Sequence, residues 1–167
     1  MAARTLSSLL PKGSGMERIE PIQILLVEDS PDDVLLTQEA LKDARIANEM
    51  NAVGDGVAAM QYLRGAEPFE ERIAPDLVIL DLNLPKKDGR QVLREIKEDP
   101  GLKQLPVIVM STSGEAEDIL GAYQDHVNAY IQKPVDFDEF IAVVRSLENF
   151  WLSIVRLPPR GDTNARA

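Results

Sequence analysis

Cysteine is missing from all 167 residues of the chain, and histidine occurs only once, at His126. Without cysteine the chain can form no disulfide bond and offers no thiol for catalysis or metal binding. A single histidine also excludes a multi-histidine metal site built from this chain alone. Both observations fit a cytoplasmic protein, and this is the location that we expect.

Basic residues are scarce, and long apolar runs are absent. The chain has 18 Lys and Arg against 28 Asp and Glu, which gives a net charge of −10. Such a charge repels phosphate backbones and anionic lipids, so we expect neither a nucleic acid nor a membrane as partner. The apolar stretches are also too short to span a bilayer, and residues 1–15 lack the apolar segment of a secretory signal.

The length is sufficient for one domain with a substantial core. Both ends of the chain have the polar, Gly-, Ser- or Pro-containing composition of segments that do not fold by themselves. We therefore predict flexible tails over residues 1–20 and 157–167, with a single domain over residues 21–156.

Short apolar segments alternate with amphipathic ones throughout this domain. The expected strands are IQILLVE, NEMNAV, LVILD, LPVIVMS and VNAYIQK, and the expected helices cover residues 31–45, 56–64, 89–98, 115–123 and 136–156. Strands separated by helical crossovers indicate an α/β fold with a five-stranded parallel sheet, doubly wound, in the order 2-1-3-4-5. NEMNAV is short and half polar, as an edge strand can be.

The first helix has a clear start signal. Ser30 can cap the helix, Pro31 takes its first position, and Asp33 follows three residues after the cap. We therefore assign Asp32 and Asp33 to structural roles at the helix start, and Asp88 to the same role in the third helix.

Chemically active side chains follow four of the predicted strands. In an open parallel sheet, ligands bind beyond the carboxyl ends of the strands, so these side chains should gather at one edge. Glu28, Asp29 and Asp81 supply three carboxylates, whose mutual repulsion calls for a cation such as Mg²⁺, which takes oxygen ligands.

The other two strand ends carry a hydroxyl and an ammonium group. Lys133 suits a phosphate oxygen and Ser111 can donate a hydrogen bond, so the set favours phosphoryl chemistry with Asp81 as the nucleophile. Each residue alone is more often a helix cap or a solvated strand end. Their joint placement on one edge favours the functional interpretation.

These residues and the predicted fold strongly resemble the receiver domain of two-component response regulators, which has a flavodoxin-like fold. The resemblance covers residues 21–156 and rests on LLVEDSPDD, LVILDLNLP, VIVMSTS and YIQKP, in family order. It implies that Asp81 accepts a phosphoryl group from the phosphohistidine of a sensor histidine kinase. It also implies Mg²⁺ or Mn²⁺ bound by Asp29, Asp81 and the Asn83 backbone carbonyl, with Glu28 acting through water.

The resemblance also implies a conformational switch. Lys133 would contact the phosphoryl group, and the bond to Pro134 would be cis. Ser111 would move toward the phosphoryl group and Tyr130 would turn inward, which alters the face made by the fourth helix, fifth strand and fifth helix. Thr112 stands where the family often has a smaller residue.

The amino-acid sequences of several segments resemble one particular group of response regulators. DLNLPKKDGR, HVNAYIQKPVDFDEF and the ending FWL are similar to the small stand-alone regulators that partner phytochrome-type histidine kinases in bacteria. With no Cys to attach a bilin chromophore, light sensing would belong to the kinase. We expect a stand-alone regulator that gains and loses its own phosphoryl group and is not a turnover enzyme.

The last helix is more apolar than one sheet contact requires. Val143, Phe150 and Ile154 extend its sheet-facing stripe sideways, and together with Leu147 they form the predicted face of a homodimer. The alternative is that residues 157–167 cover this surplus.

Three other functions remain as alternatives. An aspartyl-phosphate hydrolase would have a general acid two residues after its nucleophile, where this chain has Asn83. A nucleotide or flavin binder would need a glycine-rich first loop. A receiver-like scaffold that binds a partner kinase without phosphate would retain the fold and lose the chemistry.

Overall fold

The computed structural model describes residues 20–160, in which five parallel strands form one sheet in the order β2-β1-β3-β4-β5. The strands are Ile22–Val27 (β1), Asn48–Val53 (β2), Leu77–Leu80 (β3), Val107–Ser111 (β4) and Ala129–Gln132 (β5). The helices are Pro31–Lys42 (α2), Gly56–Arg64 (α3), Gly89–Glu98 (α4), Ala116–Gln124 (α5) and Phe137–Leu147 (α6), and Glu148–Leu152 (η1) follows α6. The predicted fold class, strand order and edge position of NEMNAV are confirmed.

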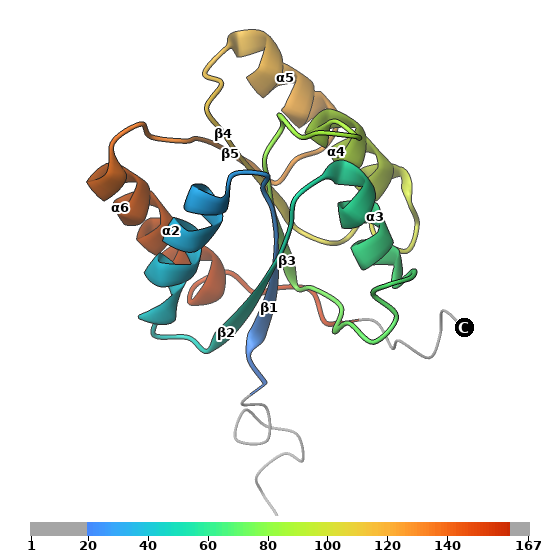
Figure 1. Cartoon of the computed structure of the whole chain (residues 1–167), viewed down its shortest axis with the longest axis horizontal. Helices are drawn as coiled ribbons and strands as arrows, with labels where there is room; N and C mark the ends of the chain where they lie inside the picture. Colours follow the sequence, from blue (N-terminus) through green and yellow to red (C-terminus); the bar gives the residue numbers. More distant parts are fainter. Residues whose placement is uncertain (1–19, 161–167) are drawn as a thin grey trace, which may run out of the picture.

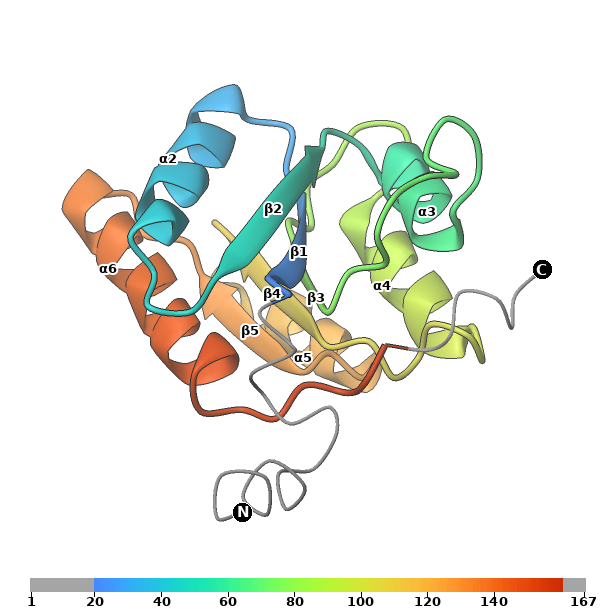
Figure 2. The same cartoon turned by 90° about the horizontal axis from the view of Figure 1, so that it is seen from below.

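Helices cover both faces of the sheet (Figures 1 and 2). Leu77 and Ile79 of β3 pack with α2 and α6, whereas Val78 and Leu80 pack with α3, α4 and α5. All four β3 residues are buried, because a central strand of a doubly wound sheet has no solvent-facing side. This continuous apolar run is the signal that located β3, and with it Asp81, in the sequence.

The start of α4 lies against the loop that follows β3. A Cβ atom on Gly89 would overlap the Asp81 carbonyl oxygen and lie 2.6 Å from Leu82 Cα, and the Gly89 amide donates to the Leu82 carbonyl at 2.8 Å. Only glycine permits this approach, so Gly89 fixes the path of the chain around Asp81.

The replacement Gly89→Ala is expected to destabilise the fold by about 1–3 kcal/mol, because the overlapped atoms belong to the backbone and cannot turn aside. Gly121→Ala is the matched control: Gly121 lies within α5, and no atom comes within 4 Å of its added Cβ. That replacement should stabilise the helix by about 0.5–1 kcal/mol. Urea unfolding of both variants checks the pair, and equal effects would contradict the role of Gly89.

The predicted last helix, residues 136–156, is wrong in its second half. Regular α-helix ends at Leu147 and continues as the π-helical turn η1, in which Glu148 is buried and accepts a hydrogen bond from the Arg45 amide at 3.2 Å. A π-helical turn holds more residues than an α-helical one, so the faces assigned from a straight helix shift. Leu147 is consequently 3% exposed and packs in the domain core, which removes it from the predicted dimer face.

The chain after η1 returns beneath the sheet (Figure 2). Arg160 Nε lies 2.7 Å from Asp76 Oδ1, and its guanidinium also donates to the Pro21 carbonyl at 3.1 Å. Arg160, which lies in the predicted flexible tail 157–167, is thus bound at the N-terminal end of the sheet. Residues 1–19 and 161–167 lie outside the described residues. Within residues 20–160, no helix is sufficiently long and apolar to cross a membrane.

Candidate functional site

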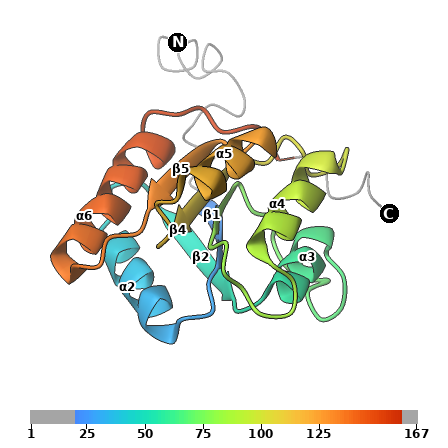
Figure 3. The ribbon, with the colours of Figure 1, turned by 90° about the horizontal axis from the view of Figure 1, so that it is seen from above.

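Three carboxylates meet at the carboxyl ends of β1 and β3, at the edge of the sheet seen in Figure 3. Glu28 and Asp29 follow β1, Asp81 follows β3, and Val27 pairs with Leu80 in the ladder between these strands. One oxygen from each carboxylate lies within 4.8 Å of the other two. Glu28 and Asp81 are buried and Asp29 is exposed, so the cluster opens to solvent on one side.

Lys133, at the end of β5, reaches into this cluster. Its Nζ lies 2.7 Å from Glu28 Oε2 and 3.4 Å from Asp81 Oδ2, and its side chain is 7% exposed. Its backbone amide donates to the Ser111 carbonyl at 2.6 Å, which anchors the end of β5 to that of β4. The structure thus brings together the predicted strand-end residues.

Asp33 also contacts Lys133, and its assignment to a purely structural role is corrected. Ser30 Oγ does accept from the Asp33 amide at 3.3 Å, but the Asp33 carboxylate lies 2.8 Å from Lys133 Nζ. Helical side chains lean toward the helix N-terminus, so an acid in the first turn of α2 is directed back to the strand ends. That lean is the signal by which the sequence could have revealed Asp33. Asp32 is exposed.

Burial and charge shape the electrostatics of the cluster. Burial raises the pKa of Glu28 to about 7, against the opposing effects of hydrogen bonds from Lys133 and the Ser30 amide. Burial alone lowers the pKa of Lys133, but hydrogen bonds to Asp33 and Glu28 and the charge of Asp81 outweigh it and raise that pKa. Lys133 therefore stays protonated beside the three carboxylates that it contacts, those of Glu28, Asp33 and Asp81, and the excess of negative charge suits a divalent cation with oxygen ligands.

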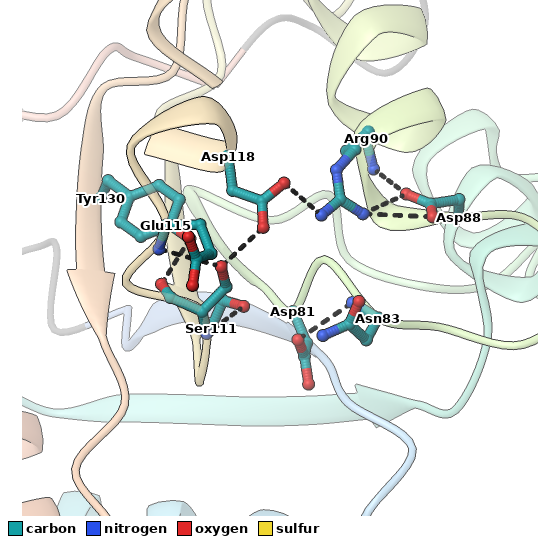
Figure 4. Close-up of polar contacts among 9 residues, drawn as sticks. Asp81, Asn83, Asp88, Arg90, Ser111, Glu115, Asp118 and Tyr130 are labelled. Atoms are coloured by element: carbon teal, nitrogen blue, oxygen red, sulfur yellow. Dashed lines mark hydrogen bonds and ion pairs between the residues drawn. The ribbon is translucent and has the colours of Figure 1, made fainter. Parts of the chain in front are cut away.

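The loop after β3 holds Asp81 in a fixed orientation. Asp81 Oδ1 accepts from the Asn83 amide at 3.1 Å (Figure 4). The Asp81 amide donates to the Val27 carbonyl at 3.0 Å. The loop ends at Asp88, whose Oδ1 accepts from the Arg90 amide at 2.7 Å, as its predicted capping role requires. One carboxylate oxygen of Asp81 thus has a backbone donor, while the other faces Lys133.

Neither Ser111 nor Tyr130 is joined to Asp81 by a hydrogen bond, and Figure 4 shows the Tyr130 ring apart from the Asp81 carboxylate. Ser111 is completely buried, and its Oγ accepts from the Ser113 amide at 3.2 Å. The Tyr130 ring packs against the core, and its hydroxyl donates to the Ser113 carbonyl at 2.8 Å. Ser111 and Tyr130 are therefore both hydrogen bonded to Ser113, in the loop after β4.

The expected cis bond before Pro134 is wrong. Among residues 20–160 the single cis peptide bond is Glu67–Pro68, so Lys133–Pro134 is trans. A bond preceding proline favours trans by only about 0.5–1 kcal/mol, so the chain path decides the isomer. Here the chain leaves through the fully exposed Val135 to Asp136, which caps α6 by accepting from the Glu139 amide at 3.0 Å.

Residues 24–145 match the family model of the response regulator receiver domain. Fold, site and family match agree, and the chain belongs to the response regulator receiver family. It is 46% identical over 138 residues to the response regulator Rcp1 of Synechocystis sp., across 83% of this chain and 94% of that one.

Two solved structures extend the likeness. The Mn²⁺-bound form of Rcp1 superimposes with a TM-score of 0.81 at 46% identity, over 83% of this chain and all of that chain. The phosphorylated cyanobacterial phytochrome response regulator RcpA gives a TM-score of 0.81 at 47% identity, over 83% of this chain and 99% of that chain. The expected similarity to phytochrome response regulators is thus confirmed.

Proposed function

We propose that this chain is a phosphorelay regulator that accepts a phosphoryl group on Asp81. The observation that supports this most directly is the Asp81 carboxylate itself. It lies at the end of β3 among Glu28, Asp29 and Lys133. Asp81 Oδ2 is 3.4 Å from Lys133 Nζ. Similarity to a regulator solved in its phosphorylated form adds support.

In the transfer, a carboxylate oxygen of Asp81 bonds to phosphorus while the phosphorus–nitrogen bond of a phosphohistidine breaks. The electron pair of that bond stays on the imidazole nitrogen of the donor. Lys133 Nζ already faces Asp81 Oδ2 at 3.4 Å, so an oxygen of the new phosphoryl group comes within its reach. Ser111 then turns its hydroxyl toward the same group, and Tyr130 moves inward, which changes the face formed by α5, β5 and α6.

Asp29, Asp81 and the Asn83 carbonyl would hold a Mg²⁺ or Mn²⁺ ion, with Glu28 acting through water. When bound, this ion neutralises charge on the phosphoryl oxygens. The oxygens of Glu28, Asp29 and Asp81, within 4.8 Å of one another, suit a small divalent ion, and a Mn²⁺-bound relative fits the same expectation.

The partner in this proposal is a phytochrome-type histidine kinase, and the setting is the cytoplasm. The regulator gains and loses one phosphoryl group itself, so it is a stoichiometric relay component and not a turnover enzyme.

Intact mass spectrometry tests the proposed chemistry. The protein is incubated with acetyl phosphate in the presence of Mg²⁺ and again with a chelator. One added phosphoryl group that needs the metal is expected. No gain under either condition, together with no transfer from an autophosphorylated phytochrome-type kinase, would contradict the proposal and favour the phosphate-independent scaffold.

We also propose a homodimer through the end of α6 and η1. Phe150 is 51% exposed and Ile154 is 69% exposed. Val143, the third residue of this predicted face, lies within α6 and is partly buried. The described part of the alternative cover, residues 157–160, runs to Asp76 and leaves Phe150 and Ile154 exposed. Apolar side chains exposed to this extent are expected at an interface with a second copy.

The replacement Phe150→Glu is expected to convert the dimer to monomers, because it places a charge in the apolar contact. Ile73→Glu is the matched control, since Ile73 is also 51% exposed but lies in the loop before β3. Light scattering after size-exclusion chromatography gives the mass of each species. A wild type that is monomeric, or a control that dissociates equally, would contradict the assignment of this face.

A further inference from the structure

Ser113 joins the two proposed switch residues to a third element of the fold. Its amide donates to Ser111 Oγ at 3.2 Å, and its carbonyl accepts from the Tyr130 hydroxyl at 2.8 Å. Its own hydroxyl donates to Asp118 Oδ2 at 2.5 Å and accepts from the Glu115 amide at 3.3 Å. One residue of the loop after β4 thereby holds both hydroxyl groups that the switch has to move.

Asp118 connects the loop after β4 to Arg90 at the start of α4. Its Oδ1 lies 2.6 Å from Arg90 Nη2, and Figure 4 shows Arg90 between Asp118 and Asp88. Arg90 is the second residue of α4, directly after Gly89, whose position is fixed against the Asp81 loop. The hydrogen bond from Ser113 and that from Arg90 lower the pKa of Asp118, so its carboxylate is charged.

We propose that Arg90 and Asp118 are positioning residues that, through Ser113, hold Ser111 and Tyr130 in the arrangement that precedes phosphorylation. This inference rests on the proposed role of Asp81 as phosphoacceptor. It adds the restraint that the phosphoryl group has to overcome: the Ser113 amide donates to Ser111 Oγ at 3.2 Å, and this hydrogen bond is lost when Ser111 turns its hydroxyl toward the phosphoryl group. The strength of the restraint sets how readily the protein switches.

Removing the contacts of Arg90 and Asp118 is expected to favour the switched state. Contacts that are present before the switch and lost after it oppose the switch, so removing them favours the switched state. A partly exposed charged pair contributes modestly, and its removal should tighten binding of a phosphoryl analogue by about two- to fivefold. The network therefore limits the switch without taking part in phosphoryl transfer.

The experiment measures the affinity of the full chain for beryllofluoride, an aspartyl-phosphate analogue, in the presence of Mg²⁺. Asp118→Ala is expected to bind about two- to fivefold more tightly than wild type. Asp125→Ala is the first control, because Asp125 pairs with Arg94 at 3.6 Å and so also joins an α4 arginine to the α5 side, without contacting Ser113. Glu117→Ala is the second, since it removes the other acid from the first turn of α5. Neither control should change the affinity.

A further variant separates positioning from general loosening of the fold. If Asp118 acts through Ser111 and Tyr130, then Asp118→Ala should have no effect in a background that carries both Ser111→Ala and Tyr130→Phe. An unchanged or weakened affinity in the single variant, or an equal gain in that background, would overturn the inference.

Amide hydrogen exchange tests directly whether Asp118 restrains the loop after β4. Exchange of residues 112–118 in the unphosphorylated protein should quicken in Asp118→Ala and stay unchanged in Asp125→Ala. A wild type that binds no beryllofluoride and gains no phosphoryl group would sink the proposed function, whereas normal binding with no effect of Asp118→Ala would sink the positioning role alone.

Discussion

The replacement Asp81→Asn is expected to abolish phosphoryl gain from acetyl phosphate completely. An amide nitrogen and a neutral carbonyl oxygen cannot replace the carboxylate nucleophile, whereas the shape of the side chain is retained. Asn can still accept from the Asn83 amide, which contacts Asp81 Oδ1 at 3.1 Å, so the loop should keep its path. Intact mass should show one added phosphoryl group on the wild type and none on the variant.

Asp88→Asn is the control for this experiment. Asp88 is the next acid along the same loop, its carboxylate is 46% exposed, and it caps α4 through the Arg90 amide, a bond that asparagine also makes. Phosphoryl gain should therefore be unchanged in this variant. If Asp81→Asn still gained a phosphoryl group while Asp88→Asn lost it, the acceptor would be misassigned.

Much of the site could be predicted because strand ends are visible in the sequence. The apolar run Leu77–Leu80 stops at Asp81, and IQILLV stops at Glu28, so the order of strands alone places these carboxylates together. The packing of both faces of the sheet follows from the same alternation of strands and helices. Predictions of this kind need only the local pattern and the general geometry of a parallel sheet.

Two of the predictions that failed depend on contacts between distant parts of the chain. Asp33 and Lys133 are 100 residues apart, and the burial of Glu148 depends on the Arg45 amide, 103 residues away. The local pattern of α2 explains Asp33 fully as a first-turn acid, and that of the last helix describes an uninterrupted α-helix. Neither pattern contains the distant partner that decides the outcome.

Removing the ammonium group with Lys133→Met is expected to destabilise the protein by about 3–5 kcal/mol, the usual cost of leaving a buried charge without its partner. Met keeps the length of the apolar stem, so the loss reports on charge and not on packing. The side chains of Lys133, Glu28 and Asp81 are 7%, 5% and 10% exposed, so water cannot compensate for the missing ammonium group.

Lys42→Met is the matched control for this variant. Lys42 Nζ lies 2.8 Å from Glu39 Oε1, which is shorter than the distance between Lys133 and Asp81. The side chains of Lys42 and Glu39 are, however, both more than half exposed. Removal of the Lys42 ammonium group should leave the free energy of unfolding nearly unchanged, because water screens an exposed pair. Unfolding in urea gives both values. Equal losses in the two lysine variants would show that burial does not determine the contribution of Lys133.

Repeating the unfolding with Mg²⁺ adds a second comparison. Because a divalent ion finds a more negative cluster once the ammonium group is gone, Mg²⁺ should stabilise Lys133→Met more than wild type.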